Sequence, residues 1–154
     1  MAKTYRLNLP TRLANGMMRS LLAAGLGPGF LRLLTVTGRK TGKERTTPVA
    51  PLETSEGRWL VAPFGEVGWV RNIRAHNHAL LRRGRHVEHI EVEEVPPAES
   101  VSVLRSYLRL KPQGKFVQAY FDVTPDSSDE DIVAEAPRHP AFRIVSSTPA
   151  GEGG

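Results

Sequence analysis

The sequence predicts an α+β fold in which helices flank a mostly antiparallel sheet or small barrel. Two observations lead to this prediction. After one helical segment, strand-like runs dominate the first part of the chain, and helical periodicity follows before a last strand-like run. The 154 residues also include 14 glycines and 12 prolines, which favours short strands joined by turns. Strands and helices grouped in this way argue against a doubly wound parallel sheet, in which they alternate.

A chain of this length is expected to form one domain. We place a loose N-terminal arm at 1–10, a single domain at 11–146 and a flexible Gly-rich tail at 147–154. The domain begins with an amphipathic helix at 11–24, for which Thr11 is the expected cap. Its apolar side chains either pack on the core or lie on a membrane surface.

The remaining elements follow in chain order. Strands are expected at 33–37, 45–52, 58–62, 79–83, 85–95 and 142–145. Helices are expected at 69–75, 98–110 and 113–121 and in an acidic stretch that ends near residue 136. Pro48 and Pro51 lack a backbone N–H group, so the run at 45–52 is expected at a sheet edge or a bulge.

Charge and composition restrict the partners. The formal net charge is +5 and the isoelectric point is about 10.0, which suits nucleic acid, an anionic membrane or an anionic small molecule. The chain has no cysteine, which excludes disulfides and thiolate metal sites. No apolar run reaches 18 residues and no signal peptide is recognisable, so we expect a cytoplasmic protein.

The most informative segment runs from Leu34 to Pro48. Strand-like residues enter and leave a glycine-bracketed turn, and four cations lie between Arg39 and Arg45. Threonine hydroxyls and backbone N–H groups lie close by, as in sites that bind phosphate or carboxylate. A hairpin tip that charge keeps soluble is the alternative interpretation.

Several other classes of site are excluded or disfavoured. The segment is no nucleotide P-loop, because three residues instead of four separate its glycines and Glu44 stands where a magnesium-binding hydroxyl is needed. No metal site is expected, because His76 and His78 lack an accompanying HExxH motif or carboxylate set. Aromatic residues make up 6% of the chain and do not alternate with its cations, which disfavours a nucleic-acid-binding barrel.

Three segments together resemble one family. Residues 33–48 (LLTVTGRKTGKERTTP), 59–63 (WLVAP) and 69–75 (WVRNIRA) resemble the nitroreductases and quinone reductases of actinobacteria that depend on the deazaflavin coenzyme F-420. The resemblance is firmest over 31–95 and continues more loosely to about residue 146. It implies a split β-barrel of the flavin-reductase type and a reductase that transfers a hydride from the reduced coenzyme to a quinone-, nitro- or enone-type acceptor. FMN is the second choice of cofactor.

The resemblance also implies which residues form the site. Cofactor binding is expected from Arg39, Lys40, Thr41, Gly42, Arg45, Thr46, Thr47, Pro48, Val49, Ala62, Pro63, Phe64, Gly65, Gly68, Trp69 and Asn72. The acceptor is expected against Phe116 and Tyr120, with Tyr107 as a further candidate. No catalytic side chain is assigned, because the cofactor supplies the difficult chemistry. Tyr120 or a water could stabilise charge on the acceptor oxygen.

One departure from the family pattern leaves alternatives open. Many members follow the third strand with a Ser-Lys-Gly-Gly-like loop, whereas residues 64–68 here read Phe-Gly-Glu-Val-Gly. A non-catalytic carrier of a deazaflavin, flavin or lipid on the same barrel is therefore the alternative function. The expected partners are a small-molecule acceptor and, by analogy with related barrels, a second copy of the chain.

Overall fold

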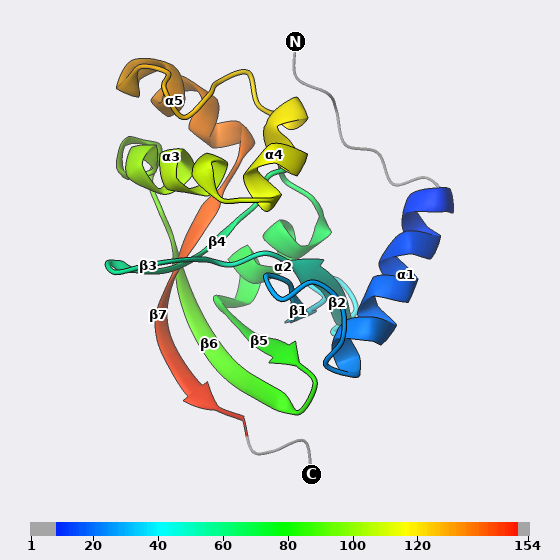
Figure 1. Ribbon diagram of the computed structural model, residues 1–154. Helices are drawn as coiled ribbons and strands as arrows, with labels where there is room; N and C mark the ends of the chain where they lie inside the picture. The colour runs from blue at the N-terminus through cyan, green and yellow to red at the C-terminus, as the bar shows by residue number, and fades with distance from the viewer. Residues whose placement is uncertain (1–8, 151–154) are drawn as a thin grey trace.

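A single antiparallel sheet organises the protein (Figure 1). The computed structural model describes residues 9–150. The sheet has the strand order β2-β1-β5-β6-β7-β4-β3, and every neighbouring pair is antiparallel. Its strands are β1 (Arg32–Thr37), β2 (Glu44–Val49), β3 (Leu52–Thr54), β4 (Gly57–Val61), β5 (His78–Arg83), β6 (His86–Glu94) and β7 (Ala141–Pro149). The sheet curls into a half-barrel, which confirms the predicted split β-barrel with a mostly antiparallel sheet.

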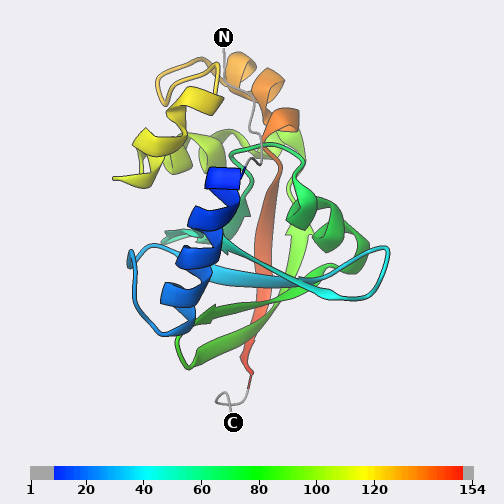
Figure 2. The same cartoon turned by 90° about the vertical axis from the view of Figure 1, so that its right-hand side faces the viewer.

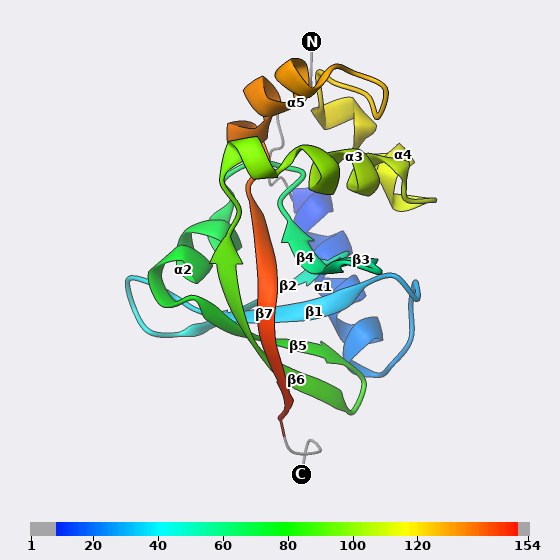
Figure 3. The ribbon, with the colours of Figure 1, turned by 90° about the vertical axis from the view of Figure 1, so that its left-hand side faces the viewer.

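Helices cover the curled sheet on different sides. They are α1 (Leu9–Ala23), α2 (Gly68–His76), α3 (Val101–Arg109), α4 (Gln113–Val117) and α5 (Asp129–Glu135). Figure 3 shows α3, α4 and α5 gathered at one end of the sheet, and Figure 2 shows α1 lying along the side that β1 and β2 form. No helix in this part of the chain is long and apolar enough to cross a membrane.

The strand expected at 45–52 is in fact two strands. The chain leaves the ladder at Ala50 and Pro51, so that β2 and β3 form opposite ends of the strand order. Pro51 cannot donate a ladder hydrogen bond, which favours a break at this point. The curl of the sheet allows this short link to connect its two ends. Pro48 lies on β2, which pairs only with β1, and the predicted edge position is confirmed.

Both ends of the predicted domain differ from the sequence expectation. Helix α1 begins at Leu9, so Thr11 lies within the helix instead of capping it. Strand β7 continues to Pro149, and Ser147 pairs with Ile90 of the long strand β6. The tail predicted at 147–154 was therefore wrong for its first three residues, because β6 extends far enough to pair with them. The rest of the predicted arm and tail, at 1–8 and 151–154, lies outside the described residues.

Two apolar clusters fill the molecule. One joins the helical layer to β3 and β4, and its most buried members include Leu52, Leu104 and Ile132. The other fills the curl of the sheet with Leu34, Ile73, Phe142 and their neighbours. Alternate residues of β4 face the two clusters, since Trp59 and Val61 belong to the first and Leu60 to the second. The loop that follows β4 therefore leaves from a strand anchored on both faces.

Candidate functional site

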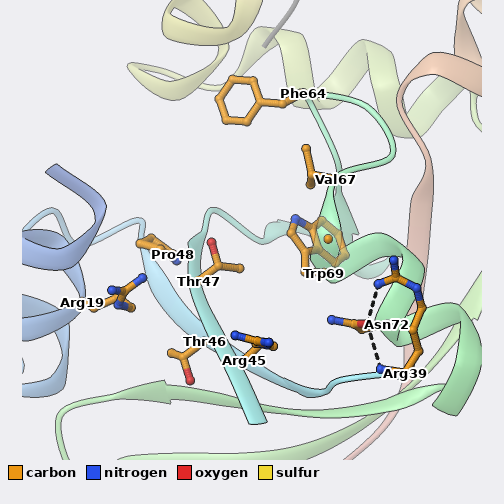
Figure 4. Close-up of a pocket in the computed structure, with 11 residues that line it drawn as sticks. Arg19, Arg39, Arg45, Thr46, Thr47, Pro48, Phe64, Val67, Trp69 and Asn72 are labelled. Carbon is orange, nitrogen blue, oxygen red and sulfur yellow. Dashed lines mark hydrogen bonds between the residues drawn. The ribbon is translucent and has the colours of Figure 1, made fainter. Parts of the chain in front are cut away.

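An open groove lies where five elements meet: α1, the turn between β1 and β2, strand β2, the loop after β4 and the start of α2 (Figure 4). Its volume is about 400 Å³. Cations, hydroxyls, an amide and apolar or aromatic groups line it. The lining residues are Arg19, Arg39, Arg45, Thr46, Thr47, Pro48, Phe64, Val67, Gly68, Trp69 and Asn72.

The glycine-bracketed turn between β1 and β2 holds its shape by its own hydrogen bonds. The Gly38 N–H donates to the Lys43 carbonyl at 2.7 Å, and the Gly42 N–H donates to the Gly38 carbonyl at 2.9 Å. Gly42 adopts a φ of +74°, which disfavours a side chain there. The Thr41 hydroxyl accepts from the Lys43 N–H at 3.3 Å, so it supports the turn. The turn is therefore a defined loop that presents Arg39 in one direction.

Asn72 fastens this turn to α2. Its Oδ1 atom accepts hydrogen bonds from the Arg39 backbone N–H at 3.1 Å and from Arg39 Nη1 at 2.9 Å. Asn72 is 5% exposed, and Figure 4 shows its amide nitrogen pointing away from Arg39, toward the Arg45 side of the groove. The oxygen is thus engaged within the protein, and the N–H₂ group is what Asn72 can offer to a ligand.

The groove is positively charged. Arg19, Arg39 and Arg45 line it, and within residues 9–150 none of the three forms an ion pair with a carboxylate. Guanidinium groups bind carboxylates and phosphates in a planar, bidentate manner. An anionic ligand therefore has donors available without displacing a protein carboxylate.

Glu66, the acidic residue that departs from the family pattern, leaves this charge intact. Its Oε1 atom is 3.0 Å from Nη1 of Arg74, and Arg74 also pairs with Glu94 at 2.7 Å. Glu66 does not line the groove. Its charge is partly balanced by Arg74. Compared with the Ser-Lys-Gly-Gly-like loop of many family members, this loop therefore lacks a cation but places no anion among the arginines of the groove.

Trp69 supplies the main aromatic surface of the groove. The indole packs at a tilt against Phe142, with ring centroids 5.8 Å apart, and is therefore held by the core. Figure 4 shows it between the loop that carries Phe64 and Val67 and the polar group of Asn72. A planar ring system beside Trp69 would meet an apolar face and, next to it, hydrogen-bond donors.

A second pocket, of about 180 Å³, adjoins the groove. Pro48, Phe64 and Trp69 line both spaces, so they form the boundary between them. The other residues around this pocket are mostly apolar and come from the segment before β1, the end of β2 and the residue after it, the end of β4 and the loop that follows, and the helical layer: Phe30, Leu31, Val49, Ala50, Val61, Pro63, Tyr107, Gln113, Phe116 and Val117. Burial raises the pKa of the Tyr107 hydroxyl above its usual range, so this group stays neutral.

The loop between the two spaces is tied to the helical layer by a buried histidine. His139 Nδ1 lies 2.9 Å from the Pro63 carbonyl, and its Nε2 lies 2.8 Å from Oε2 of Glu135. Phe121 stacks on the imidazole with ring centroids 3.6 Å apart. Because a carbonyl only accepts, the hydrogen bond to Pro63 requires a proton on Nδ1. Burial lowers the pKa of His139, and the Glu135 carboxylate opposes this shift.

The structure brings most of the expected site residues together. Those that line the groove are Arg39, Arg45, Thr46, Thr47, Pro48, Phe64, Gly68, Trp69 and Asn72. Val49, Pro63 and Phe116 line the apolar pocket, as does Tyr107. Six expected residues line neither space: Lys40, Thr41, Gly42, Ala62, Gly65 and Tyr120. Tyr120 is nevertheless close, because its ring meets Phe64 edge-on at 4.8 Å.

Sequence reasoning missed several residues of the site. Arg19 belongs to no motif of the sequence, and the packing of α1 beside β2 brings it to the groove. Gln113 gave no signal either, because it follows a proline in a segment whose alignment to the family is loose. His139 lies in no motif of the sequence, although it is 3% exposed. No local pattern reveals these placements, since each depends on contacts between distant segments.

Comparisons with known proteins agree with this architecture. A solved chain described as a domain-swapped dimer is 19% identical, covers 88% of this chain and 98% of its own length, and has a TM-score of 0.54. An F420-H2-dependent reductase, FDR-A, is 21% identical, with coverage of 75% and 94% and a TM-score of 0.51. The protein Atu2129 of Agrobacterium tumefaciens, of unknown function, is 12% identical, with coverage of 97% and 62% and a TM-score of 0.52. At these identities the likeness concerns the fold alone.

No curated protein matches the sequence. Residues 12–120, however, match the family of F420H2-dependent quinone reductases. That range includes most of α1, the basic turn, Trp69, Asn72 and the helices that border the apolar pocket. The chain therefore belongs to the F420H2-dependent quinone reductase family and is an oxidoreductase that uses coenzyme F-420.

Proposed function

We propose that the cationic groove binds reduced coenzyme F-420 and that the adjoining apolar pocket binds a quinone-, nitro- or enone-type acceptor. One observation carries the proposal: the two spaces share Pro48, Phe64 and Trp69. A ligand in one space would therefore lie beside a ligand in the other. Such proximity is the main requirement of a hydride transfer between two bound molecules.

The groove fits the coenzyme in both of its chemical parts. The coenzyme has an anionic phosphodiester and glutamate tail, for which Arg19, Arg39 and Arg45 are the available donors. Lys40 and Thr41 stay predicted members of the clamp, at the exposed tip of the turn. The deazaflavin ring is expected against Trp69 and the Asn72 amide. When bound, the coenzyme supplies the hydride, and the protein supplies binding, orientation and exclusion of water.

The acceptor pocket needs no strong acid for this chemistry. Its lining is mostly apolar and includes Tyr107, whose hydroxyl stays neutral. Phe116 is 72% exposed and stands at the edge, where it can cover a bound ring. Tyr120 supports Phe64 through their edge-on contact, so we assign it a packing role beside the acceptor.

Fluorescence titration with the oxidised coenzyme tests the cofactor site. We expect Arg39→Ala and Arg45→Ala each to weaken binding by roughly tenfold, because each removes a charged hydrogen-bond donor. Lys43→Ala is the matched control, since it removes a cation from the same turn that does not line the groove. Unchanged affinity in both arginine variants would contradict the clamp.

Mixing the reduced coenzyme with menadione then separates a reductase from a carrier. A reductase reoxidises the coenzyme in step with menadione reduction. A carrier binds the coenzyme with the same affinity but leaves it reduced. Tight binding without turnover, also with nitro and enone acceptors, would therefore favour the carrier.

The first helix also bears on partners. Leu13 and Met17 lie one turn apart on α1 and are 67% and 68% exposed, so this helix presents apolar side chains outward. We propose that this face touches a membrane surface. The double variant Leu13→Ser/Met17→Ser should then co-sediment less with anionic vesicles than the wild type does.

Analytical ultracentrifugation of the wild type and this double variant tests the expected homodimer. A dimer that is present in the wild type and lost in the variant would assign this face of α1 to a second copy of the chain instead.

A further inference from the structure

One buried amide stands out in the apolar pocket. Gln113, the first residue of α4, lines this pocket and is 8% exposed. Its Oε1 atom is buried and has no hydrogen-bond partner within residues 9–150. Arg58 Nε is also buried without a hydrogen bond, but that atom lies 3.2 Å from a carboxylate oxygen of Glu53.

An unpaired amide in this position is unfavourable in the empty protein. Burying a polar group without a partner costs about 1–3 kcal/mol. Exchanging the oxygen and nitrogen of the amide would only leave an N–H group in the same situation. Methionine has nearly the same shape and would fill the space without this penalty. Since buried polar groups in native proteins are nearly always paired, a partner from outside the chain is the simplest explanation.

The backbone holds Gln113 firmly at the pocket. The next residue, Gly114, packs so closely on the end of α3 that an added Cβ would collide with the Leu108 carbonyl. The Gly114 N–H also donates to the Leu110 carbonyl at 2.8 Å. Gln113 thus begins α4 at a tightly packed corner between α3 and α4.

We propose that Gln113 binds the acceptor by hydrogen bonding to one of its oxygen atoms. This inference rests on the proposed function, because it assumes that the apolar pocket holds the acceptor. The ligand class is a compact ring compound, mostly apolar, with at least one carbonyl or nitro oxygen. A volume of about 180 Å³ suits a small ring system, since a cavity of about 150 Å³ holds benzene.

An amide suits both redox states of such a ligand. A quinone offers only acceptor oxygens, and the Gln113 N–H₂ group can donate to one of them. Reduction adds a hydride and a proton, both from the reduced coenzyme, so the quinone becomes a hydroquinone by gain of two electrons and two protons. The hydroquinone hydroxyl can then donate to Oε1 of Gln113. Gln113 is therefore an acceptor-binding residue that can hydrogen-bond to both redox states, through its N–H₂ group to the quinone and through Oε1 to the hydroquinone.

Binding to the coenzyme-free protein tests this proposal. Quenching of tryptophan fluorescence reports on the pocket, because Trp69 lines it. The probes are menadione and 2-methylnaphthalene, which has a similar shape and no oxygen. We expect Gln113→Met to weaken menadione binding by roughly tenfold, the worth of one hydrogen bond. Binding of 2-methylnaphthalene should be unchanged or tighter. An equal change for both probes, or none for either, would overturn the proposal.

Gln118→Leu is the matched control. Gln118 does not line the pocket, and its Nε2 donates to the Val123 carbonyl at 2.7 Å. This variant should lower the melting temperature and leave menadione binding unchanged, whereas Gln113→Met should keep or raise the melting temperature. When the reduced coenzyme is mixed with menadione, Gln113→Met should raise KM for menadione more than it lowers kcat. Wild-type protein that binds no coenzyme would instead refute the proposed function.

Discussion

Arg39 and Asn72 are joined by two hydrogen bonds to a single oxygen, although they lie 33 residues apart in the chain. One bond comes from the Arg39 backbone at 3.1 Å and the other from its Nη1 atom at 2.9 Å. The pair fastens the basic turn to helix α2. The segments 33–48 and 69–75, which carry the family resemblance, are therefore joined to each other at the groove.

Substitutions of Asn72 separate the structural part of this pair from its contact with a ligand. Asn72→Ala leaves the Arg39 N–H without its partner and should lower the free energy of unfolding by about 1–3 kcal/mol. Asn72→Asp keeps an acceptor for Arg39, but it replaces the amide donor with a charge. It should therefore weaken oxidised coenzyme binding while stability is largely kept. Urea unfolding measures the stability of each variant, and fluorescence titration measures its affinity for the oxidised coenzyme. An affinity of Asn72→Asp equal to that of the wild type would show that the Asn72 amide does not bind the coenzyme.

The arginines of the groove should act through charge. We expect Arg19→Ala to raise the coenzyme dissociation constant by roughly tenfold at low ionic strength, because it removes a charge-assisted contact. The effect should shrink with added salt, which screens exposed charges. Arg71→Ala, from the exposed side of α2, is the control with the same charge change. A salt-independent loss in Arg19→Ala would point to altered packing of α1.

His139 should make stability depend on pH. Burial lowers its pKa below the usual 6.5, so the unfolded chain takes up a proton before the folded protein does. The contribution of neutral His139 is therefore complete above pH 6.5 and declines as the pH falls below it. The free energy of unfolding should fall by at most about 1.4 kcal/mol per pH unit from this group.

His139→Gln provides the comparison for this pH dependence. Urea unfolding of both proteins between pH 7.5 and pH 5 should show the steeper loss in the wild type. A gain of stability for the wild type on acidification would mean that the ring is held as an imidazolium beside Glu135, whose carboxylate favours that form.

Gly38 should tolerate no side chain. A Cβ atom there would lie 2.8 Å from the Lys43 carbonyl oxygen, which is backbone and cannot move without opening the turn. We expect Gly38→Ala to lower stability by about 1–3 kcal/mol and to weaken coenzyme binding through displacement of Arg39. Gly29→Ala is the control, because no atom lies within 4 Å of its Cβ position. Equal melting temperatures for the two variants would contradict this reading of the turn.

Local patterns were sufficient for the hairpin and its turn. Glycines that bracket a cationic run between β-branched residues predicted the β1–β2 connection, and the turn lies there. Alternation and turn residues also placed β4, β5 and β6 to within a few residues. They did not reveal that β2 and β3 occupy opposite ends of the sheet, because the partner of an edge strand is chosen by the curl of the whole sheet.

Some residues of the candidate site could likewise be predicted from the sequence, and others are placed only by tertiary contacts. By itself, the sequence determined the cationic turn, the spacing to Trp69 and Asn72, and through them the family. Tertiary structure alone decided that Arg19 of α1 reaches the groove, that Gln113 faces the apolar pocket and that His139 holds the Pro63 carbonyl. The physical reason is that hydrogen bonding and periodicity along one segment are encoded locally. Contacts between segments arise only when two apolar cores bring the helices against the sheet.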